Sequence, residues 1–256
     1  MHDAFTINAT RTDQALASPS TKKRSQTTQW LAKKCAETLR SALDLDEEHT
    51  RLLEFGCGGG ALAMHLCQDV ASYTGIDASS KAVARLNERF SHQGLEPSEA
   101  QAHCFNVHHQ LDPPQTLASP SNPSLHIDPV DCLVASMVHH HLPDPTSTTA
   151  LLIHHFLKPG GTVAILDLVY NPAHDHLFST SSLHQGHVRE DGVCWHGGFS
   201  RETALSWIAQ TGCTDITYEG QAFSLTRTLS SPPSQYHFSF FLLTAKKPLS
   251  SPSSPP

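Results

Sequence analysis

The chain has 256 residues, and its 17 Lys and Arg against 24 Asp and Glu give a formal net charge of −7 at pH 7. This length suffices for one sizeable hydrophobic core in a single domain. The acidic balance argues against electrostatic attraction to nucleic acid or to an anionic membrane surface. No segment has the apolar length needed to span a bilayer. We therefore expect a soluble, cytoplasmic protein that binds neither nucleic acid nor membrane.

The cysteines and histidines raise the alternative of a metal site. The 7 cysteines include no Cys-x-x-Cys pair, and most stand in apolar contexts, as expected for small buried side chains in a reducing compartment. The 19 histidines are unusual. Neighbouring histidines on a helix or strand point in different directions, however, and no repeated ligand spacing links the clusters. We interpret them as compositional bias and assign no metal ligands.

The first part of the chain alternates helices and strands after a polar beginning. Residues 1–26 are rich in Ser and Thr, so we expect a disordered tail. From Thr28, apolar residues recur at helical spacing, which predicts an amphipathic helix. Strands are then expected at 51–55, 72–76 and 102–107, with helices at 60–67 and 80–90 between them. Alternation of this kind implies crossover connections and a parallel sheet.

A segment rich in proline and serine, residues 112–129, interrupts this alternation and is interpreted as a surface insertion. Further strands are expected at 131–136, 162–168, 215–225 and 237–245, with helices at 148–157 and 200–211. Ser200 is the expected N-cap of the last helix, and Gly160-Gly161 are expected to turn the chain after a helix. The short connection between the last two strands predicts an antiparallel pair, and residues 248–256 form a second tail.

The most informative segment is residues 52–60, which read Leu-Leu-Glu-Phe-Gly-Cys-Gly-Gly-Gly. A short apolar strand leads through a carboxylate into a glycine loop, where positive φ is allowed and the backbone can approach a ligand closely. The next strand ends on Asp77, near the offset at which an acid meets ribose hydroxyls. Together these features predict a nucleoside-binding crevice.

Four motifs in order resemble the class I S-adenosylmethionine-dependent methyltransferases, especially the small-molecule, ubiquinone-biosynthesis-like branch. They are Leu53–Gly60, Gly75-Ile76-Asp77, Asp131–Val134 with His140–Asp144, and Leu157–Gly161. The resemblance implies one domain over residues 27–247 with an α/β, doubly wound, mostly parallel seven-stranded sheet and a C-terminal antiparallel hairpin. It also implies transfer of a methyl group from S-adenosylmethionine to an oxygen, nitrogen or carbon of a small molecule.

The resemblance assigns cofactor contacts residue by residue. Asp77 would accept from the ribose hydroxyls, and Glu54 would lie near the ammonium group of the methionyl part. Asn106 stands where the family more often has Asp, and its amide oxygen can still accept from the adenine amino group. The full set of expected cofactor-binding residues is Glu54, Gly56, Cys57, Gly58, Gly60, Asp77, Ala78, Asn106, Val107 and Ser136.

Catalysis by such an enzyme needs mainly proximity between the acceptor and the methyl carbon, with a base where the acceptor carries a proton. The candidate bases are His140, His141 and His196. A substrate lid is expected from residues 169–199 and the helix around Trp30, because aromatic residues give both an apolar surface.

Two alternatives remain at this point. The glycine loop also satisfies the loose G-x-G-x-x-A form of an NAD(P)-dependent oxidoreductase, with Asp77 at a fitting distance. Against that alternative, no Tyr has a Lys four residues later, and the closing hairpin favours the methyltransferase fold. The other alternative is a catalytically inactive relative that serves as a binding protein. The sequence leaves the acceptor, the methylated atom and the oligomeric state open.

Overall fold

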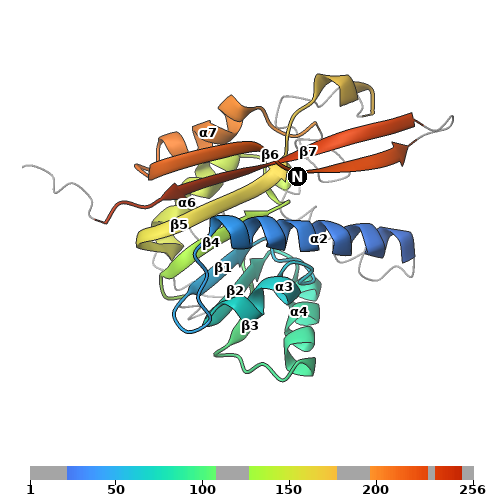
Figure 1. Ribbon diagram of the computed structural model, residues 1–256. Coiled ribbons are helices and arrows are strands. Elements are labelled where there is room, and N and C mark those ends of the chain that lie inside the picture. The colour runs from blue at the N-terminus through green and yellow to red at the C-terminus, as the bar shows by residue number, and fades with distance from the viewer. Residues whose placement is uncertain (1–21, 108–126, 178–196, 230–233, 250–256) are drawn as a thin grey trace, which may run out of the picture.

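The protein is built on one seven-stranded sheet with the strand order β3-β2-β1-β4-β5-β7-β6 (Figure 1). The computed structural model describes residues 22–107, 127–177, 197–229 and 234–249. The strands are β1 Arg51–Phe55, β2 Ser72–Asp77, β3 Ala100–Cys104, β4 Val130–Ser136, β5 Leu157–Leu168, β6 Thr214–Leu229 and β7 Ser234–Lys246. The first five strands are parallel, and β7 is antiparallel to both β5 and β6. This confirms the predicted fold class.

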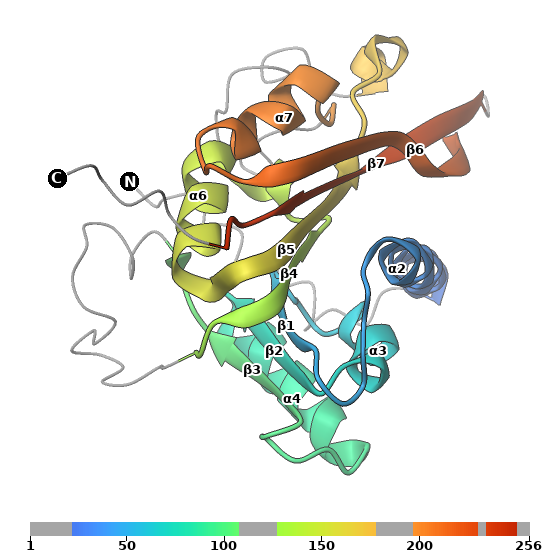
Figure 2. The same cartoon turned by 60° about the vertical axis from the view of Figure 1, so that its left-hand side comes forward.

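Helices cover both faces of the sheet, as a doubly wound fold requires (Figures 1 and 2). They are α2 Lys22–Ala42, α3 Ala63–Leu66, α4 Ser80–His92, α6 Pro145–Phe156 and α7 Arg201–Ala209. On one face, Leu39, Leu66 and Leu86 of α2, α3 and α4 belong to one hydrophobic core. On the other face, Phe156 and Trp207 of α6 and α7 belong to a second core. The central strands are buried between these cores and are therefore almost wholly apolar.

Side-chain caps fix where three helices begin. Ser79 accepts a hydrogen bond from the backbone N–H of Ala82 at the start of α4. Asp144 does the same for α6, where Pro145 occupies the first helical position, and Ser200 for α7. Each cap satisfies a backbone donor that has no partner within its helix. The predicted cap at Ser200 is confirmed.

Several element boundaries differ from the sequence predictions. α2 begins at Lys22, so it includes residues 22–26 that were assigned to the tail. The helix expected at 60–67 is shortened to Ala63–Leu66, followed by the 3₁₀ helix η1 Cys67–Asp69, because the glycine loop continues to Gly60 with a φ of +78°.

The predicted glycine turn is instead an irregularity inside β5. Gly160 has a φ of +80°, as a left-handed turn requires. Its N–H nevertheless donates to the carbonyl of Lys247 at 2.8 Å, and the N–H of Lys247 donates to the carbonyl of Gly161 at 2.9 Å. These bonds extend the ladder with the segment after β7. Leu157 also pairs with Val130 of β4, so β5 begins at Leu157 rather than at Thr162.

Most of the predicted tails, insertion and lid lie outside the described residues. A few residues of the predicted lid are described. A parallel bridge pairs Val169 with Phe199, and Phe199 is 1% exposed and packs against Trp207 with ring centroids 4.7 Å apart. Phe199 is therefore a core residue and not part of a lid. Trp30 on α2 is 37% exposed and meets the edge of Phe223 on β6.

The carboxyl ends of the five parallel strands meet at one edge of the sheet. From β1 the chain continues to β2 and β3 on one side, whereas β4 and β5 lie on the other side. The strand order therefore reverses between β1 and β4. Ligands of open α/β sheets bind in the crevice that such a reversal creates. The residues just after Phe55 of β1 and Ser136 of β4 flank this crevice.

Candidate functional site

The glycine loop after β1 forms one wall of the crevice. Gly56, Gly58 and Gly60 all have positive φ, of +73°, +50° and +78°. A Cβ on Gly56 would lie 2.4 Å from Val138, and one on Gly60 would lie 2.3 Å from Leu86, whereas a Cβ on Gly58 would meet no atom within 4 Å. The protein itself thus requires glycine at positions 56 and 60. Gly58 faces open space, so its backbone is accessible to a ligand.

Asp77 at the end of β2 holds this loop from the adjacent strand. Its Oδ2 accepts from the N–H of Gly58 at 2.9 Å, and its Oδ1 accepts from the N–H of Ser79 at 2.8 Å. A carboxylate has about four acceptor positions, so Asp77 can hold both backbone groups and also accept from the hydroxyls of a ligand. Ala78 follows at the same edge and is half-buried.

The segment after β3 lies next to Asp77. The N–H of Phe105 donates to the carbonyl of Asp77 at 2.9 Å. Asn106 is half-buried, whereas Val107 is 1% exposed and belongs to a hydrophobic core. Asn106 can therefore present a polar side chain to a ligand, and Val107 can contribute only through its backbone.

Helix α4 supports the loop from behind, which sequence reasoning missed. The Nη1 atom of Arg89 donates to the carbonyls of Gly59 and Gly60 at 2.8 and 3.0 Å. Asn87 bonds both the N–H and the carbonyl of Ala102 on β3. These side chains couple the helix to the loop and to the strand beside it.

Glu54 lies beneath the loop. It is 3% exposed, and the hydroxyl of Tyr73 donates to its Oε2. Burial raises the pKa of Glu54 to about 8. The hydrogen bond from Tyr73 lowers this pKa, and the charge of Asp77 raises it further. The neighbouring Cys57 is 4% exposed and its sulfur packs where a Cβ on Gly75 would lie, at 2.8 Å. The Cys57 side chain is thus directed into the core.

The opposite wall of the crevice follows β4 and contains a histidine–aspartate pair. The 3₁₀ helix η2, His139–His141, comes three residues after Ser136. Nδ1 of His140 bonds Oδ1 of Asp167 at 2.9 Å, and the backbone N–H of His140 donates to Oδ2 at 3.2 Å. Asp167 lies near the end of β5 and is fully buried, while the His140 side chain is 19% exposed.

The charges of this pair stabilise each other. Burial alone would lower the pKa of His140, but the charge of Asp167 and the hydrogen bond to it outweigh burial, so the pKa is raised. Burial would likewise raise the pKa of Asp167, but the charge and hydrogen bond of His140 hold it below its usual value. An imidazole whose Nδ1 is held by a carboxylate keeps Nε2 as the nitrogen that can exchange a proton.

The other histidines near this wall have different surroundings. The ring centroid of His141 lies 4.2 Å from that of His140, so His141 is beside the pair. His139 is 1% exposed, bonds Thr149 and stacks on Trp207, and burial lowers its pKa to about 4, so its role is packing. His196 lies outside the described residues.

Helix α2 contacts the carboxyl end of β4 through Cys35. Burial raises the pKa of this thiol to about 12, and the side chain of Ser136 forms a hydrogen bond with it. Ser136 thus lies at the predicted edge of the crevice, under α2. Cys35 brings α2 close to the carboxyl groups of Glu54 and Asp167. Asp167, Cys35, Tyr73 and Arg89 are residues of this region that the sequence predictions did not include.

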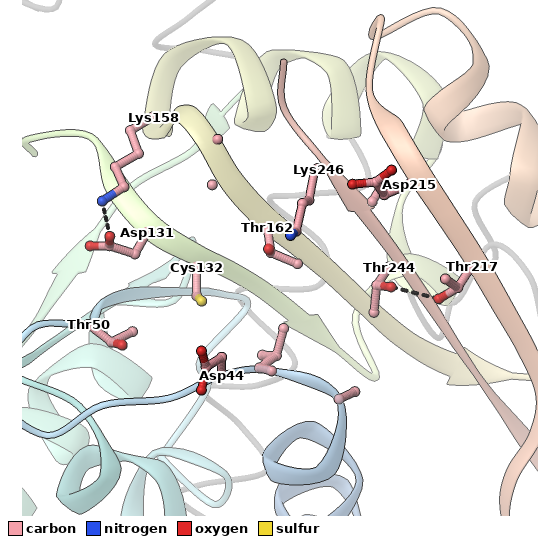
Figure 3. A pocket seen from close by; sticks show the side chains of 15 residues that line it. Asp44, Thr50, Asp131, Cys132, Lys158, Thr162, Asp215, Thr217, Thr244 and Lys246 are labelled. Atoms are coloured by element: carbon pink, nitrogen blue, oxygen red, sulfur yellow. Dashed lines mark hydrogen bonds and ion pairs between the residues drawn. The ribbon is translucent and has the colours of Figure 1, made fainter. Parts of the chain in front are cut away.

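A separate cavity of about 530 Å³ lies at the opposite edge of the sheet (Figure 3). Its polar side chains come from the beginnings of β4, β5 and β6, the end of β7 and the segment between α2 and β1, and they include the ion pair of Asp131 with Lys158. Strands of an open α/β sheet present their ligands at the carboxyl edge. This cavity is therefore distinct from the crevice that contains the predicted residues.

Known proteins show the same fold and related sequences. An uncharacterized methyltransferase of Schizosaccharomyces pombe is 28% identical over 172 residues, which cover 67% of this chain and 56% of that protein. A ubiquinone biosynthesis O-methyltransferase of Aromatoleum aromaticum is 36% identical over 115 residues, 44% of this chain and 42% of that protein. The chain thus spans about half the length of these curated relatives.

Solved structures agree on the fold. The YcgJ protein of Bacillus subtilis superposes with a TM-score of 0.60 at 13% identity, covering 83% of this chain and 97% of that one. Geranyl diphosphate C-methyltransferase from Streptomyces coelicolor gives a TM-score of 0.58 at 16% identity, covering 84% and 76%. A family model described as a methyltransferase domain matches residues 27–217. The chain belongs to this methyltransferase-domain family.

Proposed function

We propose that this protein transfers a methyl group from S-adenosylmethionine to a hydroxyl group of a small molecule. The observation that carries the proposal is the crevice between β1 and β4, with an accessible glycine backbone and Asp77 on the β1 side and the bonded pair of His140 and Asp167 on the β4 side. Family membership supports the reaction class, and the printed name of the O-methyltransferase relative supports oxygen as the acceptor atom.

The residues of the crevice fit a cationic nucleoside ligand. Two carboxyl groups, Glu54 and Asp77, lie at the glycine loop, and Gly58 leaves open space in front of its backbone. A sulfonium and an ammonium group complement such an acidic crevice. The fold differs from the dinucleotide-binding strand order as well, because β7 runs antiparallel between β5 and β6.

In this proposal each wall of the crevice holds one part of the cofactor. Asp77 and Ala78 hold the ribose, Asn106 and the Val107 backbone edge the adenine, and Gly58 and Ser136 flank the methionyl part. Gly56 and Gly60 give the loop its shape through packing. When bound, S-adenosylmethionine supplies an electrophilic methyl group.

His140 is the proposed general base. Asp167 holds Nδ1, so Nε2 can take the proton of the acceptor hydroxyl as the oxygen forms its bond to the methyl carbon and the sulfur–carbon bond breaks. The proton then passes from His140 to solvent. Because the displacement is in line, most of the rate comes from holding the acceptor close to the methyl carbon in a site shielded from water.

The test is calorimetric titration of the protein with S-adenosylmethionine, S-adenosylhomocysteine and NADH in parallel. We expect the first two to bind and NADH not to bind. Binding of NADH alone would overturn the proposal in favour of the oxidoreductase alternative. Cofactor binding without methyl transfer to any of a panel of phenols and other hydroxylated compounds would favour the inactive relative.

A further inference from the structure

Met137 has a backbone conformation that methionine seldom adopts. Its φ is +56°, and among the residues that the structure describes Asp215 is the other non-glycine residue with a positive φ. In this left-handed region the Cβ of an L-residue approaches the following carbonyl oxygen. Met137 directly follows Ser136, the last residue of β4, at the edge of the crevice. Backbone strain of this kind persists only where the surrounding structure holds it, and it gathers at functional sites.

The left-handed residue breaks the alternation of side chains along β4. Val134 belongs to the core on the α2 face of the sheet, and Ala135 belongs to the core on the α6 and α7 face. A continued strand would direct Met137 to the same face as Ala135. Instead, Met137 packs against the core on the α2 face and Val138 against the core on the opposite face. The chain therefore turns at Met137 as it leaves the sheet.

This turn returns the chain to the end of β5. The N–H of Met137 donates to the carbonyl of Leu166 at 2.8 Å, which continues the pairing of β4 with β5. Three residues later, the N–H and Nδ1 of His140 bond the carboxylate of Asp167, the residue after Leu166. An extended chain advances about 3.3 Å per residue, which would carry His140 roughly 10 Å past Met137. The reversal that begins at Met137 lets His140 reach Asp167 instead.

The same turn brings the two walls of the crevice into contact. A Cβ on Gly56 would lie 2.4 Å from Cγ2 of Val138 and 2.8 Å from its Cβ, so Val138 lies directly against the beginning of the glycine loop. The carbonyl of Val138 accepts from the N–H of His141 at 2.9 Å and thereby starts η2. The position of His140 is thus fixed relative to the loop that is proposed to hold the cofactor.

We propose that Met137 is a positioning residue for the base, and that its left-handed backbone, rather than its side chain, sets the distance between His140 and the cofactor loop. This inference rests on the proposed function. Methyl transfer is sensitive to such placement, because a shift of about 1 Å in a reacting group can cost about 100-fold in rate. In this role Met137 needs no contact with the cofactor or the acceptor.

Three substitutions of Met137 separate the backbone from the side chain. Met137→Val introduces a β-branched residue, which disfavours a positive φ. Met137→Gly removes the whole side chain and adopts a positive φ freely. Met137→Leu keeps an apolar side chain of similar size without branching at Cβ. Asp215→Val is the matched control, because it places valine at a φ of +50° in β6, beside the cavity at the opposite edge of the sheet.

Two measurements report where His140 lies. The first is turnover at saturating cofactor, with cofactor affinity measured separately by calorimetry. The second is proton NMR of protein with isotope-labelled histidine, in which the Nδ1–H that is bonded to Asp167 gives a downfield resonance that His140→Gln lacks. The resonance needs no substrate, so it tests the turn independently of catalysis.

We expect Met137→Val to lower turnover about 100-fold and to shift or lose the resonance, with a smaller change in cofactor affinity. Met137→Gly and Met137→Leu should keep both the turnover and the resonance of the wild type, because both tolerate the turn at least as well as valine does not. Asp215→Val should lower the melting temperature and change neither measurement.

Wild-type turnover and resonance in Met137→Val would overturn the inference. Equal losses in Met137→Gly and Met137→Val would also overturn it, because they would assign the role to the side chain. The glycine variant keeps the test decisive if Met137→Val does not fold. If the wild-type protein does not bind S-adenosylmethionine, the proposed function falls, whereas the resonance still reports the bond between His140 and Asp167.

Discussion

The carboxylate of Asp77 accepts a hydrogen bond from the backbone N–H of Gly58 at 2.9 Å, although the two residues lie 19 positions apart. The bond joins the end of β2 to a loop glycine whose Cβ position is open space. A single side chain therefore both shapes the ligand-facing backbone and offers acceptors to the ligand. Substitution of Asp77 should consequently affect the loop as well as the contact.

Asp77→Ala is expected to weaken binding of S-adenosylmethionine by about 1–3 kcal/mol, because a charged acceptor is lost. It should also lower the melting temperature, since the N–H groups of Gly58 and Ser79 lose their partner. Calorimetry and thermal denaturation measure the two effects. Asp77→Asn keeps an acceptor oxygen, so its cofactor affinity and its melting temperature should both stay closer to those of the wild type. Unchanged affinity in Asp77→Ala would contradict its assignment to the ribose.

Two of the loop glycines should respond differently to alanine. Gly58→Ala should lower the free energy of unfolding by about 1–2 kcal/mol, because alanine is strained at the positive φ of this position. Its methyl group enters the open space where the ligand is expected. The variant should lose most cofactor binding and remain folded. Gly56→Ala should instead unfold at a lower temperature, because its Cβ would lie 2.4 Å from Cγ2 and 2.8 Å from Cβ of Val138.

Gly94 supplies the control for backbone strain. Its φ is +77° and a Cβ there would also meet no atom within 4 Å, but it follows α4 away from the crevice. Gly94→Ala should match Gly58→Ala in melting temperature and keep wild-type affinity for S-adenosylmethionine. Equal affinities in the two variants would show that the backbone at Gly58 does not face the ligand.

Arg89 is expected to act on cofactor affinity without touching the cofactor. Arg89→Met removes both bonds to the loop carbonyls, and we expect binding to weaken about tenfold, the equivalent of one charged hydrogen bond. Arg85→Met is the matched control, because Arg85 is exposed one turn earlier on α4. Similar affinities in these two variants would show that the loop keeps its shape without Arg89.

Local patterns explain what the sequence could predict. The strand, the glycine loop and the acid after β2 are signals carried by neighbouring residues, so Glu54, Gly58 and Asp77 could be proposed from the sequence. Gly56 and Gly60 are crowded by Val138 and Leu86, whereas Gly58 faces open space. The sequence could not distinguish these glycines, because such contacts are set only by the tertiary fold.

The second wall shows the opposite case. His140 was a candidate because it follows β4, but its partner Asp167 is 27 residues further along and on another strand. The register places Asp167 beside Phe241 in a strand that is otherwise apolar. An acid inside a buried apolar strand, near its carboxyl end, is a signal that could have been used, since buried charges need a partner.

The last prediction tests the base. His140→Gln should lower turnover by about 10²–10⁴-fold, because no base remains to take the proton of the substrate hydroxyl. Cofactor affinity should be kept, since the cofactor-binding residues are unchanged. His141→Gln, which alters the neighbouring ring without removing the bond to Asp167, is the control and should change turnover little. The measurement is turnover at saturating cofactor with any accepted hydroxylated substrate.

The pH profile separates a base from a structural histidine. Only neutral His140 can take a proton, so wild-type turnover should rise with pH through the His140 pKa, which Asp167 holds above its usual value. Asp167→Asn removes the charge that opposes burial, so this limb should move to lower pH while maximal turnover falls. A merely structural role for Asp167 would lower turnover and leave the position of the limb unchanged. Wild-type turnover in His140→Gln across the whole pH series would exclude His140 as the base and direct attention to acceptors that need no deprotonation.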